Sequence, residues 1–206
     1  TRSIPMLDPD TVKGFLAPKE GLALAAHARE AGELGPVLEI GSYCGKSALY
    51  LGPAARAAET VLYTLDHHRG SEEHQSGEEY HDPDLFNSEL GVVETLPALR
   101  DTLFRAELED CVIPIIGKSA TVSRHWTTPL GMVFIDGGHS MQAALADYRG
   151  WTPNLVTGGI LAIHDVFPNP EDGGRPPFEI WKLATASGLY ETVRRVGTLE
   201  VLRRLP

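Results

Sequence analysis

The fold is decided by one stretch near the start of the chain, Val37-Leu38-Glu39-Ile40-Gly41-Ser42-Tyr43-Cys44-Gly45-Lys46-Ser47. An apolar run ends beside an acid, and two glycines follow, Gly41 and Gly45, with three residues between them. This pattern predicts a strand, a tight turn and a helix that begins near Ser47, because glycine lets the backbone pass close to a ligand. The stretch therefore indicates a binding loop for a nucleotide-like molecule.

Two common phosphate-binding loops fit this stretch poorly. A P-loop has four residues between its glycines, one more than here. A dinucleotide-binding fingerprint needs a glycine where Tyr43 stands, because a side chain there holds the backbone away from a pyrophosphate. Glu39 would also repel a phosphate at the strand end. A ligand without a phosphate, with a positive charge near Glu39, fits better.

Composition limits the class of protein and its partners. A chain of 206 residues with 42% hydrophobic residues supports one core, so we expect a single domain over residues 1–206. The formal net charge of −10 argues against a nucleic-acid partner, because Lys and Arg supply most of the affinity for phosphates. The 2 cysteines are too few for a disulfide framework, and no long apolar run predicts a membrane segment or an export leader. We expect a cytoplasmic protein with a small-molecule or neutral-glycan substrate, and a homodimer is left open.

Apolar runs and helix-forming segments alternate along the chain. We expect strands over residues 37–40, 61–65, 112–116, 132–135, 160–163, 190–196 and 199–205, and helices over residues 18–32, 47–58, 90–107, 141–151 and 178–187. Short, fully apolar strands are typical of a parallel sheet that helices cover on both faces. The expected fold is therefore α/β: a Rossmann-like, doubly wound, mostly parallel seven-stranded sheet whose last two strands form an antiparallel pair at the edge.

Polar residues stand at or just after each of the first five expected strands: Glu39, Asp66, Ser119, Asp136 and His164-Asp165. In open α/β sheets, ligands bind at the carboxyl ends of the strands, so these residues are expected to share one site. The last two strand ends bring Asp136, His164 and Asp165 together, and such a set can hold a divalent ion, Mg²⁺ or Mn²⁺. His139, three residues past Asp136, is placed to act as a general base.

These motifs together resemble the metal-dependent class I O-methyltransferases, which use S-adenosylmethionine, and most closely the macrocin and mycinamicin group that acts on sugar hydroxyls. The Glu-x-Gly-x-x-x-Gly pattern from Glu39 to Gly45 is similar to their first motif, and the resemblance runs from Val37 to Phe167. In that group an Asp-x-x-His segment supplies a metal ligand and a general base, which Asp136 and His139 match.

The resemblance also implies a role for each remaining residue. Asp165 matches the acidic pair that completes the metal shell, whereas His164 stands where an acid is usual. The resemblance assigns the cofactor-binding residues as follows: the amino-acid end of S-adenosylmethionine to Glu39, Gly41 and Gly45, the loop lining to Ser42 and Tyr43, the ribose hydroxyls to Asp66, the adenine edge to Ser119, and a place beside the cofactor to Asp136.

Most of these residues also have a simpler explanation. Asp136 and Ser119 can each cap a helix, and Asp66 is common in turns. His139 can be a solvated residue at a helix start, and His164 can bond to nearby backbone. These alternatives remain open at this stage.

Two polar segments are expected to border the acceptor pocket. Residues 67–89 form a lid-like insertion that contains four histidines and seven acids. No ligand pair in it has the spacing of a closed zinc site, so a solvated lid is favoured over zinc binding. Residues 168–177, which follow Asp165, form a second wall.

The predicted activity is transfer of a methyl group from S-adenosylmethionine to a hydroxyl of a sugar or glycan, with a divalent metal to position the acceptor and His139 as base. An unactivated alcohol needs both a metal and a dedicated base, which favours sugars over catechols. A catechol or phenol O-methyltransferase is the alternative acceptor class. A nucleotide-binding phosphotransferase or hydrolase, with Lys46-Ser47 as its phosphate loop, and a binding protein without turnover are the alternatives from other classes.

Overall fold

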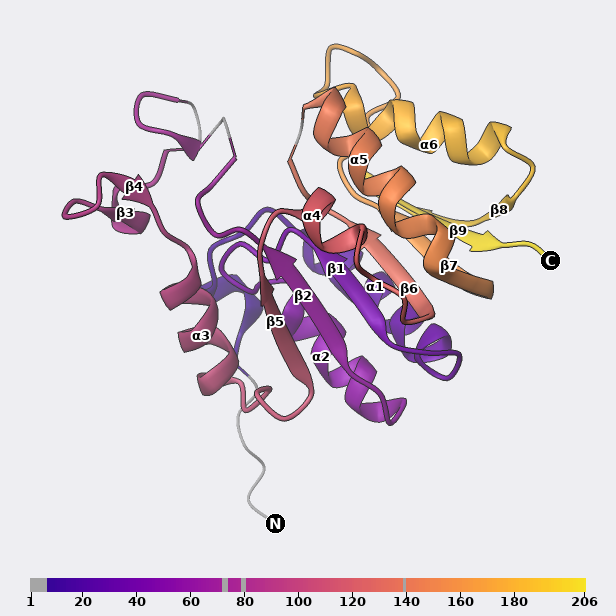
Figure 1. Ribbon diagram of the computed structural model, residues 1–206, viewed down its shortest axis with the longest axis horizontal. Coiled ribbons are helices and arrows are strands. Elements are labelled where there is room, and N and C mark those ends of the chain that lie inside the picture. The colour runs from indigo at the N-terminus through magenta and orange to yellow at the C-terminus, as the bar shows by residue number, and fades with distance from the viewer. Residues whose placement is uncertain (1–6, 72–73, 79–80, 139) are drawn as a thin grey trace.

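The computed structural model describes residues 7–71, 74–78, 81–138 and 140–206 (Figure 1). Its main sheet has seven strands in the order β5-β2-β1-β6-β7-β9-β8. The strands are β1 (Val37–Ile40), β2 (Leu62–Asp66), β5 (Val112–Ile116), β6 (Leu130–Ile135), β7 (Leu155–Ile163), β8 (Tyr190–Val196) and β9 (Leu199–Arg204). The first five run parallel, β9 is antiparallel to β7, and edge strand β8 is antiparallel to β9. The predicted sheet and its terminal antiparallel pair are confirmed.

Helices cover both faces of this sheet. They are α1 (Pro18–Gly32), α2 (Ala48–Ala57), α3 (Leu96–Arg105), α4 (Ser119–Ser123), α5 (Met141–Trp151) and α6 (Pro176–Ala186), with short 3₁₀ turns at Pro9–Thr11, Pro83–Leu85 and Thr152–Asn154. Buried residues of α1, α2 and α3 pack on one face, and those of α5 and α6 on the other. Alternate residues of each central strand face the two cores: Val37 joins the first, and Leu38 the second. This two-sided burial explains why the strands are apolar throughout.

One predicted helix is wrong over its first part. Residues 90–95 are not helical, because Val92–Val93 forms strand β4 and pairs with strand β3, Phe86–Asn87. Gly91 turns between them with φ +67°, a conformation that favours glycine. Helix α3 begins only at Leu96, where Pro97 occupies the first turn.

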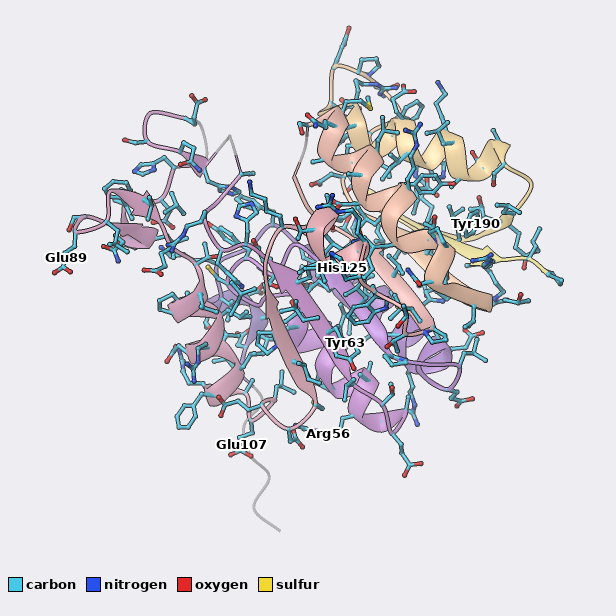
Figure 2. The ribbon with its side chains drawn as sticks, in the orientation of Figure 1. Arg56, Tyr63, Glu89, Glu107, His125 and Tyr190 are labelled. Atoms are coloured by element: carbon cyan, nitrogen blue, oxygen red, sulfur yellow. The ribbon has the colours of Figure 1, made fainter. Side chains whose placement is uncertain are left out.

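The small β3–β4 hairpin extends away from the main sheet on the side where the strands end (Figure 1). Figure 2 shows Glu89 at its tip, and Arg56 and Glu107 at the opposite end of the molecule. There Arg56 donates hydrogen bonds to the carbonyl of Glu107 and to Asp110, which joins α2 to the turn before β5. The two ends of the sheet thus differ: one is closed by packed turns, and the other carries the insertion. Among the described helices, none combines the length and apolar character that crossing a membrane requires.

Candidate active site at the carboxyl ends of the strands

A cavity of about 590 Å³ opens at the carboxyl ends of the parallel strands. Its size suits a drug-sized ligand. The predicted site residues that line it are Gly41, Ser42, Tyr43, Asp66, Ser119, Asp136 and Asp165. Three others, Glu39, Gly45 and His164, are buried or packed behind the lining. His139 lies outside the described residues.

The loop after β1 passes very close to the end of β6. Gly41 has φ +100°, and a Cβ at this position would stand 2.0 Å from the carbonyl oxygen of Asp136. The amide of Asp136 donates to the carbonyl of Ile40 at 2.9 Å, which holds the two strand ends in register. Only glycine fits this contact, so the loop glycine brings the cavity floor and Asp136 together.

Asp66 connects the same loop to the end of β2. Its carboxylate accepts hydrogen bonds from the backbone amides of Tyr43 (3.0 Å) and His68 (2.8 Å). Tyr43 has φ +45°, unusual for a residue with a side chain, and the Asp66 bond stabilises it. A carboxylate has about four acceptor positions, so Asp66 retains capacity for hydroxyl groups in the cavity.

Two residues that were predicted to contact a cofactor, Glu39 and Gly45, instead pack beneath the loop that follows β1. The Glu39 carboxylate is fully buried and accepts hydrogen bonds from the hydroxyls of Ser47 and Thr64. Burial raises the pKa of the Glu39 carboxyl to about 7, although these hydrogen bonds lower it. Gly45 faces α3, where a Cβ would meet Leu99 at 2.9 Å. Neither residue lines the cavity, because the Glu39 side chain is buried in the core and Gly45 lies against α3.

Lys46 borders the cavity, but its side chain is also held by the segment before α1. Its side chain is only 13% exposed, and its ammonium lies 3.8 Å from Asp10. Its aliphatic part would be 2.9 Å from a Cβ at Gly14, in the segment before α1. The residue that a phosphate loop would direct at its ligand therefore packs against the N-terminal segment.

Ser119 has a buried partner that the sequence interpretation missed. Its hydroxyl donates to Asp147 at 2.5 Å and accepts from the indole nitrogen of Trp151 at 2.8 Å. Burial raises the pKa of Asp147 to about 6, against the lowering effect of the Ser119 bond. Asp147 stands between Ala144 and Trp151 on the buried side of α5. An acid within the apolar stripe of a helix is the signal that would have identified it.

Asp136, His164 and Asp165 come together at the ends of β6 and β7, as the sequence predicted. One ligand atom from each lies within 4.8 Å of the other two, the one such group of His, Cys, Asp and Glu found among the described residues. Nδ1 of His164 lies 3.0 Å from Asp136 Oδ1 and 3.5 Å from Asp165 Oδ1. We call these three residues the acid–imidazole cluster. The described histidines of the insertion form no comparable group, so the structure gives no support to a zinc site there.

Glu20 of α1 contacts His164 of this cluster, on the ring nitrogen that does not face the two aspartates. The sequence interpretation did not include it. Its Oε2 lies 3.0 Å from Nε2 of His164, and both side chains are buried. Burial lowers the pKa of His164, but the neighbouring carboxylates, Asp136 first, outweigh this and raise it to about 11. Without a cation, the imidazole therefore donates from both nitrogens. A glutamate in the first turn of α1 is an ordinary helix-start signal, so only the fold reveals its partner.

The insertion and the N-terminal segment contribute aromatic rings to the cavity lining. Tyr43 and His74 stack with ring centroids 5.2 Å apart, and Phe15 lies 6.1 Å from Tyr43. Lys13 joins the two segments through ion pairs with Asp82 (2.5 Å) and Asp84 (2.9 Å). These rings offer a flat apolar surface in the same cavity as the aspartates of the acid–imidazole cluster.

Comparison with known proteins finds one matching family model and solved structures with a similar fold. The family described as "Methyltransferase domain" matches residues 38–166. Among solved structures, the O-methyltransferase NovP is similar with a TM-score of 0.69 at 13% identity, covering 91% of this chain and 80% of that one. The O-methyltransferase TomG from Streptomyces achromogenes, in complex with SAM, gives a TM-score of 0.64 at 15% identity, covering 93% and 82%. An O-methyltransferase from Bacillus cereus in complex with SAH gives 0.63 at 18%, covering 92% and 83%. At these identities, the likeness concerns the fold.

Proposed function

Because this chain belongs to the family described as "Methyltransferase domain", we propose that it transfers a methyl group from S-adenosylmethionine to a hydroxyl of a sugar or glycan. The observation that carries the proposal is the position of Asp136. Its backbone contacts Gly41 of the loop, and its carboxylate belongs to the acid–imidazole cluster. One residue thus borders both the expected cofactor position and the expected acceptor position.

The cofactor would lie along the loop after β1. Asp66 would accept hydrogen bonds from the ribose hydroxyls, Gly41 would face the amino-acid end, and Ser42 and Tyr43 would line the same loop. Ser119, held by Asp147, would border the adenine. In this proposal Glu39 acts indirectly, because its bonds to Ser47 and Thr64 keep the loop in shape.

The acceptor hydroxyl would sit at Asp136 and Asp165, and His139 would remove its proton. The hydroxyl oxygen attacks the methyl carbon, the carbon–sulfur bond breaks, and S-adenosylhomocysteine leaves with the electron pair of that bond. The acid–imidazole cluster fits a divalent cation, Mg²⁺ or Mn²⁺, because its donor atoms are carboxylate oxygens and one ring nitrogen. When bound, such a cation lowers the pKa of a coordinated hydroxyl.

Catechols and phenols are the alternative acceptors, and one observation favours them. The rings of Phe15, Tyr43 and His74 border the cavity and can stack on an aromatic acceptor. The same surface can also pack against the C–H face of a sugar.

The test is incubation with methyl-labelled S-adenosylmethionine and a panel of glycans, free sugars, catechols and phenols. We expect label in a methyl ether of a sugar, lost in excess chelator and restored by Mg²⁺ or Mn²⁺. Transfer to catechols alone would show that the acceptors are catechols and not sugars. Undiminished transfer in excess chelator would remove the cation from the proposal, and no transfer to any hydroxyl would overturn it.

A further inference from the structure

Glu20 is a fixed acceptor at the start of α1. Besides His164, three donors reach its carboxylate: the amide of Ala17 (3.1 Å), the amide of Thr198 (2.8 Å) and the hydroxyl of Thr198 (3.1 Å). The side chain is 4% exposed, so it is anchored from two elements and shielded from water. An ionised carboxylate only accepts hydrogen bonds, and all the other partners of Glu20 are donors. The Nε2 atom of His164 must therefore carry the hydrogen in the 3.0 Å contact with Glu20.

This contact decides which nitrogen of His164 faces the acid–imidazole cluster. With Nε2–H directed at Glu20, Nδ1 is the ring nitrogen that can offer a lone pair to a cation. It lies 3.0 Å from Asp136 Oδ1 and 3.5 Å from Asp165 Oδ1. Neighbouring ligands of a six-coordinate ion with bonds of about 2.1 Å are about 3.0 Å apart. The spacing around Nδ1 therefore fits a shared ion that takes the place of the Nδ1 proton.

We propose that Glu20 directs Nδ1 of His164 into the cation site, and that this nitrogen ligand makes the site prefer Mn²⁺ to Mg²⁺. The proposal rests on the proposed function, and it adds the identity of the cation and a positioning role for Glu20. Mg²⁺ strongly prefers oxygen ligands, whereas imidazole suits first-row transition ions. A carboxylate that accepts the second ring N–H is the usual outer partner of a metal-bound histidine.

The first test detects the nitrogen ligand directly. The full-length chain, freed of metal and loaded with Mn²⁺, is measured by electron spin echo envelope modulation. We expect ¹⁴N modulation that changes to the ¹⁵N pattern in protein grown with ¹⁵N-histidine. His164→Asn should remove the modulation, whereas His125→Asn should keep it, because His125 is an exposed residue after α4 (Figure 2). Bound Mn²⁺ without nitrogen modulation, or modulation that survives His164→Asn, would overturn the proposal.

The second test concerns Glu20 and uses calorimetric affinities for Mn²⁺ and Mg²⁺. Glu20→Gln removes the negative charge that holds the hydrogen on Nε2, so the lone pair of Nδ1 is no longer fixed toward a cation. We expect roughly tenfold weaker Mn²⁺ binding, a smaller change for Mg²⁺, and weaker nitrogen modulation. Glu200→Gln is the matched control, because Glu200 is equally buried but pairs with Arg195 at 3.2 Å. An unchanged Mn²⁺ to Mg²⁺ preference in a folded Glu20→Gln variant would show that Glu20 is only structural.

The methyl-transfer assay separates this inference from the proposed function. Methyl transfer supported by Mg²⁺, with no nitrogen modulation from Mn²⁺, would defeat the nitrogen ligand and leave the activity. Nitrogen modulation without methyl transfer to any hydroxyl would defeat the activity and leave the metal site. Absence of binding by both ions would defeat the nitrogen ligand together with the cation in the proposed function.

Discussion

Gly41 lies against the backbone of Asp136 so closely that a Cβ at Gly41 would stand 2.0 Å from the carbonyl oxygen of Asp136. The contact joins the loop after β1 to the end of β6. The expected cofactor loop and the acid–imidazole cluster are therefore fixed relative to each other by backbone, not by flexible side chains.

Gly41→Ala tests this contact. We expect the free energy of unfolding to fall by about 1–3 kcal/mol more than backbone strain alone would cause, because the backbone of Asp136 must move. S-Adenosylmethionine binding should be lost as well. Gly77→Ala is the control: Gly77 has φ +93° with nothing within 4 Å, so it should cost only about 1–2 kcal/mol. Equal losses in denaturant unfolding of both variants would contradict the steric explanation.

Asp66→Ala should weaken S-adenosylmethionine binding by about 1.5–3 kcal/mol, because charge-assisted hydrogen bonds to the ribose would be lost. The change also removes the acceptor for the amide of Tyr43, so the loop becomes less ordered. Calorimetry on the folded variant measures the loss, and Asp101→Ala, an exposed residue of α3, is the control. Unchanged affinity in Asp66→Ala would remove Asp66 from the site.

Asp165→Asn should weaken divalent-cation binding on the order of tenfold or more while cofactor affinity persists. Asparagine tolerates the φ of +56° at this position, so the change removes charge without straining the backbone. Asp172→Asn is the control, because Asp172 also lines the cavity but is not in the acid–imidazole cluster. If Asp165→Asn binds each ion with the same affinity as Asp172→Asn, Asp165 is not a ligand.

Glu39→Gln should change how stability depends on pH. The folded-state pKa of Glu39 is raised from 4.5 to about 7. This shift makes its whole contribution to the stability of the fold below about pH 4.5, and the contribution is lost as the pH rises to about 7. The variant should therefore gain stability relative to wild type as the pH rises through this window, on the order of 3 kcal/mol. Unfolding measured from pH 4 to 8 checks this, and a difference that stays constant with pH would refute it.

His139→Ala should lower turnover roughly 100-fold, with little change in cofactor or cation affinity, if His139 is the base. The pH–rate profile should also lose its acidic limb, because an imidazole accepts a proton only when it is neutral. Steady-state kinetics over pH on the acceptor found in the panel measures both effects. Near-normal turnover would show that another group removes the proton.

The sequence by itself determined the layered architecture and seven of the residues that line the cavity. Short apolar runs separated by helical segments place strand ends at one edge, so Asp66, Asp136 and Asp165 could be assigned to a common site from local pattern alone. The Gly41 turn followed from the same stretch. These features depend on periodicity and on the fixed rule that parallel strands end together, and neither requires knowledge of distant contacts.

Only the tertiary structure decided what lies behind that lining. All four residues of β1 are buried, so no alternation showed that Glu39 points into the core beneath the cavity. Glu20 and His164 are 144 residues apart, and Ser119 and Asp147 are 28 apart, and each pair meets only when helices pack on the sheet. Hydrogen bonds between buried polar groups depend on which distant surfaces come together, and a linear pattern of residue types does not contain that information.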